Sequence, residues 1–337
     1  MAEFKLGKMY HLGHGVPIDY AQALKWYSKA AAQGNAGAYN NMAVMSAYGQ
    51  GLPRDDRQTM QMLRAAAALG NPAAECSIGI MYQHGMGTDV DNSIAADWYA
   101  RSAAHGYATA QNNLGFLYQY GLGVVEDETT AAAWYDKAAR QANPDALNNL
   151  GWMYRNGEGV RQDYMKALSL LRRGVASGSI NAQTNLAEMY AFGLGVPRNA
   201  ALAYKLLLKS ATRGERFAQG DLGLMFAEGN GMLQDYSQAV GWYRKSAAQL
   251  HPDAMDRLGR LYEYGNGVPK DIVVAHALYT VAVFYDTALQ TSARKDFFLL
   301  SPQLSEAQRE AAEVVVGRIM ANDLPAALDA RLGPPKR

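Results

Sequence analysis

The chain has 337 residues, of which 32 are Lys or Arg and 31 are Asp or Glu, so its formal net charge is +1. This balance leaves no basic stripe for nucleic acid and no acidic tail, so neither type of partner is expected. The longest apolar stretch, residues 273–285, is too short to cross a bilayer and includes His276, so no membrane span is expected. Length alone would favour two domains.

An alanine recurs at intervals of 36 residues from Ala2 to Ala254, giving eight copies without an insertion. Two glycine columns keep the same period, from the pair Gly13 and Gly15 to the pair Gly265 and Gly267. Such self-similarity predicts a solenoid, in which each repeat buries its apolar side only against its neighbours. One stacked core then grows with the number of repeats, which overrides the two-domain expectation from length.

The first half of each repeat predicts an α-helix, which we call helix A. Columns starting at Ala2, Leu6 and Tyr10 lie on one helical stripe, because 3.6 residues per turn bring these positions to one side. The Gly-x-Gly pair ends the helix, and we expect at least one glycine of each pair to have positive φ. Capping residues precede the helix at Asn35, Asn71, Asn143 and Ser179.

The second half predicts helix B, which begins after a column of Asp or Asn that starts at Asp19 and ends at Asp271. It carries an alanine column and a pair of large residues, such as Trp134 and Tyr135, which we assign to the core. Ala142 and Leu250 stand where other repeats have glycine at the end of helix B, so those two joints are expected to be straighter or less sharply defined. The glycines that end helix B are Gly34, Gly70, Gly106, Gly178 and Gly214.

The C-terminal residues depart from the repeat. Residues 288–300 resemble a degenerate ninth helix A, and Ser305 followed by Gln308 is a capping-box signal for an amphipathic helix that covers the open end. We therefore expect capping helices over residues 288–322 and a tail over residues 323–337, disordered at 333–337. The eight repeats are expected over residues 1–287, divided as 1–36, 37–72, 73–108, 109–144, 145–180, 181–216, 217–252 and 253–287.

The repeating pattern Ala-x3-Leu-Gly-x2-Tyr-x2-Gly-x-Gly-Val-x2-Asp-x3-Ala-x2-Trp-Tyr, complete in the first copy, resembles the Sel1-like repeat, a relative of the tetratricopeptide repeat. The resemblance implies an all-α fold: a right-handed α/α superhelical solenoid of eight helix-turn-helix repeats with a C-terminal capping helix. It also implies a bacterial adaptor or scaffold, with a role in signalling among the expectations, rather than an enzyme. Cys76 is the single cysteine, which excludes the cysteine-rich branch of the family.

The chain enters the helix A pattern within its first residues, which leaves no room for a signal peptide, and one cysteine cannot form an internal disulfide. A cytoplasmic monomer is therefore expected. The alternative is a periplasmic or secreted protein whose upstream signal has been trimmed.

Candidate catalytic residues are few. His11 and His14 have a spacing that metal sites use, but no third ligand is near them in the sequence, so no metal and no cofactor are expected. Cys76 is predicted on the less buried side of its helix, without a histidine column to activate it. An enzyme of unknown type that uses such isolated Cys or His residues is the alternative to the non-enzymatic adaptor.

A binding site in a solenoid is expected where the repeats differ. The eighth position of helix A reads Val44, Ile80, Phe116 and Trp152 in four consecutive repeats. An apolar ridge flanked by amides suits a partner protein or an extended peptide on the concave helix-A surface. The amides and the one cation assigned to this site at the fourth and eleventh positions are Asn40, Asn112, Asn148, Gln119 and Arg155.

Two alternatives apply to these residues. Phe116 and Trp152 can instead fill the space between adjacent A helices, and the asparagines at the fifth position, such as Asn113, are expected to bond to neighbouring backbone. A purely structural spacer would have no binding residues at all.

Overall fold

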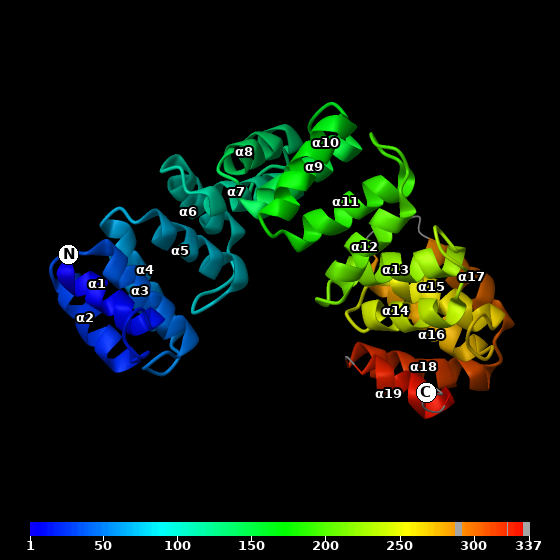
Figure 1. Cartoon of the computed structure of the whole chain (residues 1–337). Coiled ribbons are helices and arrows are strands. Elements are labelled where there is room, and N and C mark those ends of the chain that lie inside the picture. The colour runs from blue at the N-terminus through cyan, green and yellow to red at the C-terminus, as the bar shows by residue number, and fades with distance from the viewer. Residues whose placement is uncertain (287–291, 322, 333–337) are drawn as a thin grey trace. The chain divides into compact units, whose positions relative to one another are not determined.

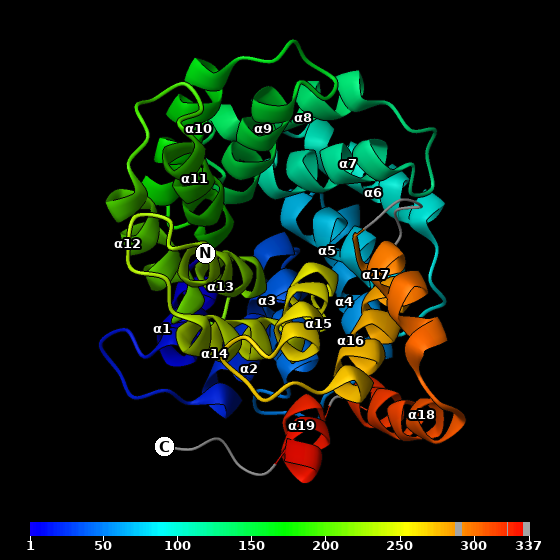
Figure 2. The same ribbon diagram turned by 90° about the vertical axis from the view of Figure 1, so that its right-hand side faces the viewer.

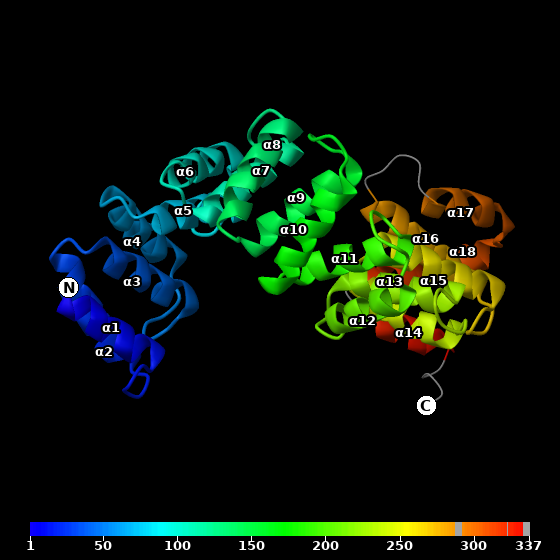
Figure 3. The ribbon, with the colours of Figure 1, turned by 45° about the horizontal axis from the view of Figure 1, so that its top comes forward.

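The computed structural model describes residues 1–286, 292–321 and 323–332, which form helices and no strand. They divide into two compact units, an N-terminal unit (Met1–Ser177) and a C-terminal unit that begins at Gly178. In the N-terminal unit each A–B hairpin packs against the next (Figures 1 and 3). Its A helices are α1 (Ala2–Leu12), α3 (Ala36–Tyr48), α5 (Pro72–His84), α7 (Ala108–Tyr120) and α9 (Pro144–Asn156), and its B helices are α2 (Tyr20–Ala32), α4 (Asp56–Ala68), α6 (Asn92–Ala104), α8 (Glu128–Arg140) and α10 (Tyr164–Ala176).

The C-terminal unit continues the same hairpins and then adds helices that depart from the pattern. No helix among the described residues is both long and apolar enough to cross a membrane. The A helices of this unit are α11 (Ile180–Phe192), α13 (Arg216–Glu228) and α15 (Pro252–Tyr264), the B helices are α12 (Ala200–Ala211), α14 (Tyr236–Ala247) and α16 (Ile272–Tyr285), and the final elements are α17 (Ser292–Leu300), the 3-10 helix η1 (Ser301–Gln303), α18 (Glu306–Met320) and α19 (Leu324–Leu332).

The predicted helix caps are confirmed. The Asn143 side chain accepts a hydrogen bond from the backbone N–H of Ala146 at the start of α9, and Pro144 occupies the first turn of that helix. All eight B helices begin after an Asp or Asn whose side chain accepts a backbone N–H from the first turn. These local bonds satisfy donors that a helix N-terminus leaves unpaired, which explains why the same residue type recurs in every repeat.

Both glycines of every Gly-x-Gly pair have positive φ, so the turn prediction is confirmed. The two glycines serve different needs. The first, such as Gly121 with φ 63°, ends helix A in the left-handed conformation. Within each unit the second lies against helix B of the preceding repeat: a Cβ on Gly159 would come within 2.3 Å of the backbone oxygen of Glu128. This close approach ties neighbouring repeats of one unit together.

The two joints without glycine are not straighter, so that expectation is wrong. Ala142 and Leu250 both have φ 58°, in the same left-handed region as Gly106 with φ 81°. The Ala142 N–H donates to the Ala139 carbonyl over 3.0 Å, and the Asn143 N–H donates to the Ala138 carbonyl over 3.2 Å. These bonds satisfy the last carbonyls of helix B, and retaining them outweighs the steric cost of a Cβ at positive φ.

The core of most repeats is built around a tyrosine of helix B. Tyr135, for example, is fully buried and lies under Gly115 of helix A, where an added Cβ would come within 2.9 Å of its ring. Trp134, its neighbour, is only half-buried, and the ammonium of Lys137 sits 3.6 Å from its ring centroid. The core assignment of the Trp-Tyr pairs is thus confirmed for tyrosine, whereas the tryptophans are partly buried and pack at the edge of the core.

α17 continues the repeat as a ninth helix A over residues 292–300, while residues 288–291 of the predicted element lie outside the described residues. Its side chains meet residues of α15 that lie 36 positions earlier: the Ser292 hydroxyl donates to Asp256 Oδ2 over 2.7 Å, and Arg260 Nε donates to Asp296 Oδ2 over 2.6 Å. The register of the solenoid is therefore kept after the glycine signals end.

α18 begins with the expected capping box, in which Ser305 and Gln308 bond reciprocally. α18 packs on α16, and α16 also contacts α17 (Figure 2). The predicted tail from residue 323 is wrong in part, because residues 324–332 form α19, with Leu324, Ala327 and Leu328 buried in the C-terminal core. Residues 333–337 lie outside the described residues.

Candidate protein-binding surface

The four eighth-position residues lie at the surface of consecutive A helices in the N-terminal unit. Val44 on α3 is 36% exposed and Phe116 on α7 is 38% exposed. Ile80 and Trp152 are half-buried, and each also packs against a neighbouring core cluster. The row thus combines open apolar side chains with others that help to fill the space between helices.

The structure adds two residues to this row, one helical turn further along. Tyr48 is 75% exposed and Tyr120 is 54% exposed, and the rings of Phe116 and Tyr120 lie 4.7 Å apart between centroids. Spacing of i and i+4 on one helix face was the sequence signal that could have identified them. We call the six side chains the apolar row, which consists of Val44, Tyr48, Ile80, Phe116, Tyr120 and Trp152.

The electrostatic surroundings of the apolar row are unusual for surface helices, since α3 and α7 contain no Asp, Glu, Lys or Arg. Partial burial, together with the nearby carboxylate of Glu158, raises the pKa of Tyr120 above its usual value. Its hydroxyl therefore stays neutral at physiological pH. Along α3 and α7 themselves a partner encounters aromatic, aliphatic and amide groups rather than charges.

Val44, Tyr48 and Ile80 also line a hollow of about 350 Å³ between α3, α4 and α5. A salt bridge at its wall joins Arg54 Nε to Asp56 Oδ1 over 3.1 Å. The remaining lining residues are Ala43, Ala47, Thr59, Leu63, Ser77, Met81 and Met86.

Two of the amides assigned to the site, Asn112 and Asn148, are linked through a fifth-position asparagine. Asn148 is 8% exposed, and its Nδ2 donates to Asn149 Oδ1 over 3.2 Å. Asn149 Nδ2 then donates across to Asn112 Oδ1 on α7 over 3.1 Å, and Asn112 Nδ2 donates to Asn113 Oδ1 over 3.3 Å. This amide ladder links α9 to α7, so these side chains hold two A helices together.

The hydrogen bonds of Asn41, Asn113 and Asn149 go to side chains, so the expected bonds to neighbouring backbone are wrong for these three. Asn41 Nδ2 donates to the hydroxyl of Tyr27 over 3.1 Å, a side chain of the preceding helix B. Asn113 similarly lies near the hydroxyl of Tyr99. A buried hydroxyl needs a hydrogen-bond partner, which explains why an asparagine and a tyrosine recur together.

The other predicted site residues are placed differently from one another. Gln119 Oε1 accepts from the Tyr135 hydroxyl over 2.8 Å. Arg155 is half-buried and its Nε donates to Asn156 Oδ1 over 3.2 Å. Asn40 is half-buried, with a buried Oδ1 that has no hydrogen-bond partner. All nine predicted residues share the A helices of the N-terminal unit, but only Val44 and Phe116 among them are exposed.

The isolated Cys and His residues are poorly placed for catalysis. Cys76 is 2% exposed, so its prediction on the less buried side of α5 is wrong. Burial raises the pKa of its thiol to about 12, which keeps the sulfur protonated and weakly nucleophilic at neutral pH. His11 Nε2 lies 2.9 Å from Gln50 Oε1. Within the described residues, no three His, Cys, Asp or Glu side chains form a group that could hold a metal ion.

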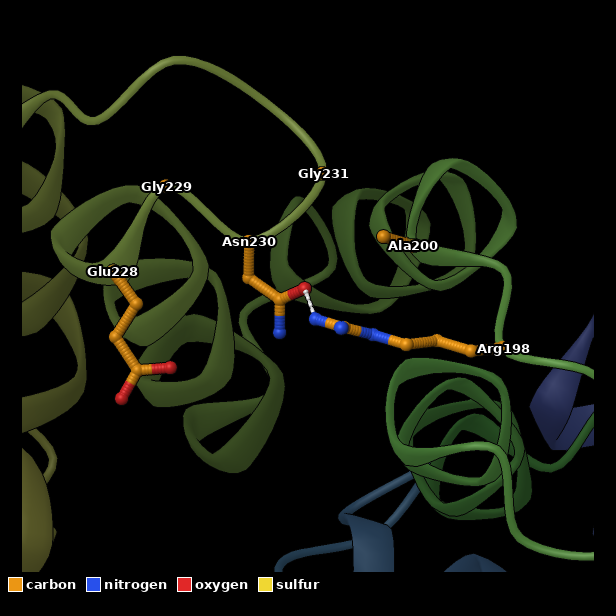
Figure 4. A pocket seen from close by; sticks show the side chains of 6 residues that line it. All are labelled: Arg198, Ala200, Glu228, Gly229, Asn230 and Gly231. Atoms are coloured by element: carbon orange, nitrogen blue, oxygen red, sulfur yellow. Dashed lines mark hydrogen bonds between the residues drawn. The ribbon is translucent and has the colours of Figure 1, made fainter.

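A charged hollow of about 530 Å³ lies at the turns of the sixth and seventh repeats in the C-terminal unit (Figure 4). Arg198 reaches across it and donates to Asn230 Oδ1, and its Nε donates to the Ala191 carbonyl over 3.0 Å. The guanidinium therefore already has hydrogen-bond partners within the protein. Unlike the apolar row, this hollow is lined by charged and polar groups.

Comparison with known families agrees with this architecture. The model of the Sel1 repeat matches eight consecutive segments, namely residues 1–35, 36–71, 72–107, 108–143, 144–179, 180–215, 216–249 and 252–282. The chain belongs to the Sel1 repeat family. Among solved structures, a Sel1 repeat protein from Oxalobacter formigenes is 28% identical, with a TM-score of 0.66, over 75% of this chain and 98% of that chain.

A protective antigen of uropathogenic Escherichia coli with the same repeat fold is 30% identical over 100% of this Sel1 repeat chain and 87% of its own, with a TM-score of 0.48. No curated protein matches the chain. The comparisons thus establish the family and an α/α solenoid built from paired helices.

Proposed function

We propose that this Sel1 repeat protein is a non-enzymatic adaptor that holds a partner protein or an extended peptide on the helix-A face of its N-terminal unit. The observation that carries the proposal is the apolar row, which presents six apolar or aromatic side chains from four consecutive A helices. Four of these side chains, Val44, Tyr48, Phe116 and Tyr120, are exposed, and exposed apolar surface marks interaction sites in proteins. The absence of charge on α3 and α7 favours an uncharged contact surface on the partner.

In this proposal the site residues take three roles. Tyr48, Phe116 and Tyr120 are the anchors, because exposed aromatic side chains bury much area at low entropic cost. Trp152 and Arg155 form one end of the contact surface. The amides at the fourth and eleventh positions, Asn40, Asn112, Asn148 and Gln119, support the A helices and line the path of the partner's backbone.

The proposal is tested with peptides selected on the full chain from a random phage-displayed library, whose dissociation constants are then measured by fluorescence anisotropy. Replacing both Phe116 and Tyr120 with alanine should weaken binding by about 2 kcal/mol or more, roughly thirtyfold, if both rings are anchors. Tyr107→Ala is the matched control, because Tyr107 is 37% exposed but lies outside the apolar row.

A second pair of variants compares two aliphatic side chains of equal exposure. Val44 on α3 and Ile94 on the B helix α6 are both 36% exposed, so Val44→Ala should weaken the selected peptides and Ile94→Ala should not. Urea unfolding of each variant separates binding from folding. The proposal is overturned if Phe116→Ala and Trp152→Ala destabilise the fold by several kcal/mol while the folded fraction binds normally, because the residues would then belong to the core.

A further inference from the structure

Most repeats of the N-terminal unit contain a set of three polar side chains that fills the space between successive A helices. In the third repeat the Tyr99 hydroxyl donates to Gln83 Oε1 over 2.7 Å and lies near the Asn113 amide of the next A helix. In the fourth repeat Tyr135 makes the same two contacts with Gln119 and Asn149. We call this set the polar triad. Its members come from helix B, from helix A of the same repeat and from helix A of the following repeat.

The second repeat lacks all three members of the polar triad. Leu63 replaces the tyrosine, Ala47 replaces the glutamine, and Ser77 replaces the asparagine. All three residues line the hollow of about 350 Å³ beside Val44 and Ile80. The hollow therefore occupies the volume that a phenol ring and two amide groups fill in the third repeat.

The same combination recurs in the sixth repeat, in the C-terminal unit. Leu207 and Ala191 stand at the tyrosine and glutamine positions, and both line a second hollow, of about 260 Å³. In the fifth repeat, by contrast, Leu171 occurs together with the long side chain of Arg155, and in the seventh Ala227 occurs together with Tyr243. Loss of both large side chains in one repeat is thus the common feature of the two hollows.

The two hollows differ in charge. At the positions of Val44 and Ser77, the second hollow has Glu188 and Asp221. The first hollow is lined mainly by aliphatic side chains, and within it Ser77 Oγ donates to the Ala73 carbonyl over 2.9 Å. A ligand in the first hollow would therefore meet an apolar wall.

Thr59 Oγ1 donates to the Asp55 carbonyl over 2.8 Å, and Arg54 and Asp56, the two charged residues of the lining, are paired with each other. Most of the remaining lining is aliphatic or thioether, which favours an apolar ring over a ring that carries a phenol hydroxyl or an indole N–H, because burying a polar group against apolar surface costs free energy.

We propose that the hollow of the second repeat is a specificity pocket for a phenylalanine side chain, carried by the peptide that the apolar row binds. This inference rests on the proposed function of that row. An apolar cavity of about 150 Å³ is enough to bind benzene, so a hollow of about 350 Å³ accommodates a phenyl ring with its methylene. Met81 and Met86 line the pocket, and thioethers make favourable contacts with aromatic rings.

The first test observes the pocket directly in the full chain labelled with carbon-13 at the methionine methyl groups. Added N-acetyl-phenylalaninamide at millimolar concentration should shift the Met81 and Met86 methyl signals upfield through the ring current, and N-acetyl-leucinamide should not. Met225 occupies the place of Met81 in the charged second hollow and serves as the internal control. Absence of a phenyl-specific shift at Met81 and Met86 would overturn the inference.

The second test rebuilds the polar triad in the second repeat by combining Ala47→Gln, Leu63→Tyr and Ser77→Asn. Ala43→Gly is added, because a Cβ at the corresponding Gly79 would come within 2.6 Å of the Tyr99 ring. This variant should fold, should lose the methyl shifts, and should bind phenylalanine-containing selected peptides at least about tenfold more weakly. Retained shifts or unchanged affinity would contradict the pocket.

Val44→Glu provides a variant that does not depend on repacking, since Val44 is partly exposed and the sixth repeat has Glu188 at this position. It should weaken phenylalanine-containing peptides more than peptides in which leucine replaces phenylalanine. An equal effect on both peptides would overturn the phenyl specificity. The Phe116 and Tyr120 double variant and the rebuilt triad separate the two proposals. If only the double variant weakens binding, the pocket is refuted and the proposed function stands. If only the rebuilt triad weakens binding, Phe116 and Tyr120 are refuted as anchors of the row and the pocket is retained.

Discussion

Replacing Ala142 with glycine is expected to stabilise the protein, although the same change inside a helix destabilises it. Ala142 has φ 58°, and a non-glycine residue in the left-handed region is disfavoured by about 1–2 kcal/mol. Glycine also gives the unfolded chain more conformational entropy, which offsets about 0.4–1 kcal/mol of the stabilisation. No contact is lost, because Ala142 is exposed and a Cβ added at the equivalent Gly106 has no heavy atom within 4 Å. The net stabilisation is therefore about 0.5–1 kcal/mol.

Urea unfolding followed by circular dichroism measures this difference. Two matched variants should destabilise the protein instead. Gly106→Ala should lower the free energy of unfolding by a similar amount, and Ala133→Gly, in an exposed position inside α8, should lower it by about 0.5–1 kcal/mol. Leu250→Gly should bring no gain, since Leu250 also has φ 58° but packs against the C-terminal core. If Ala142→Gly and Ala133→Gly lowered stability equally, the strain assigned to this joint would be refuted.

Three further outcomes are expected from the same measurements. Gly159→Ala should destabilise more than Gly121→Ala, because only the former places a Cβ against the preceding repeat's backbone; equal losses would contradict this difference. Burial lowers the pKa values of His251 and His276 below the usual 6.5, so the unfolded chain binds more protons than the folded chain. The free energy of unfolding should therefore fall as pH drops below about 6.5. An unchanged urea midpoint at pH 7.5 and 5.5 would exclude this linkage. Deleting residues 304–337 should uncover apolar surface of the last repeat and promote aggregation, which light scattering detects, whereas a monomeric and equally stable truncation would show that the final helices are dispensable.

Features that depend on a few neighbouring residues were predictable from the sequence. Asp163 and Gly157 act through backbone bonds and dihedral angles within one turn, so their spacing alone identifies the start of α10 and the end of α9. Repetition strengthened these signals, since residues that every repeat needs recur at the same position. The fold and the repeat register follow from such local rules.

Features that depend on side chains from several helices were not predictable in the same way. Cys76 was assigned to the wrong side of α5, because exposure of that side depends on how the neighbouring helices pack. The exposure of Tyr48 and Tyr120 likewise depends on which side of the A helices the B helices cover. Residues 324–332 carried no repeat signal, and their helix is stabilised by burial in the C-terminal core.

The amino-acid sequence thus determined the number of repeats, their helices and their turns, because those are set by local hydrogen bonds and by a periodic apolar stripe. Only the tertiary structure decided where the helix-A face is hollow. Ala47, Leu63 and Ser77 look like unrelated departures from the repeat when they are read along the chain. They come together at one place because three different helices meet there, and volume missing from each helix adds up to a single cavity.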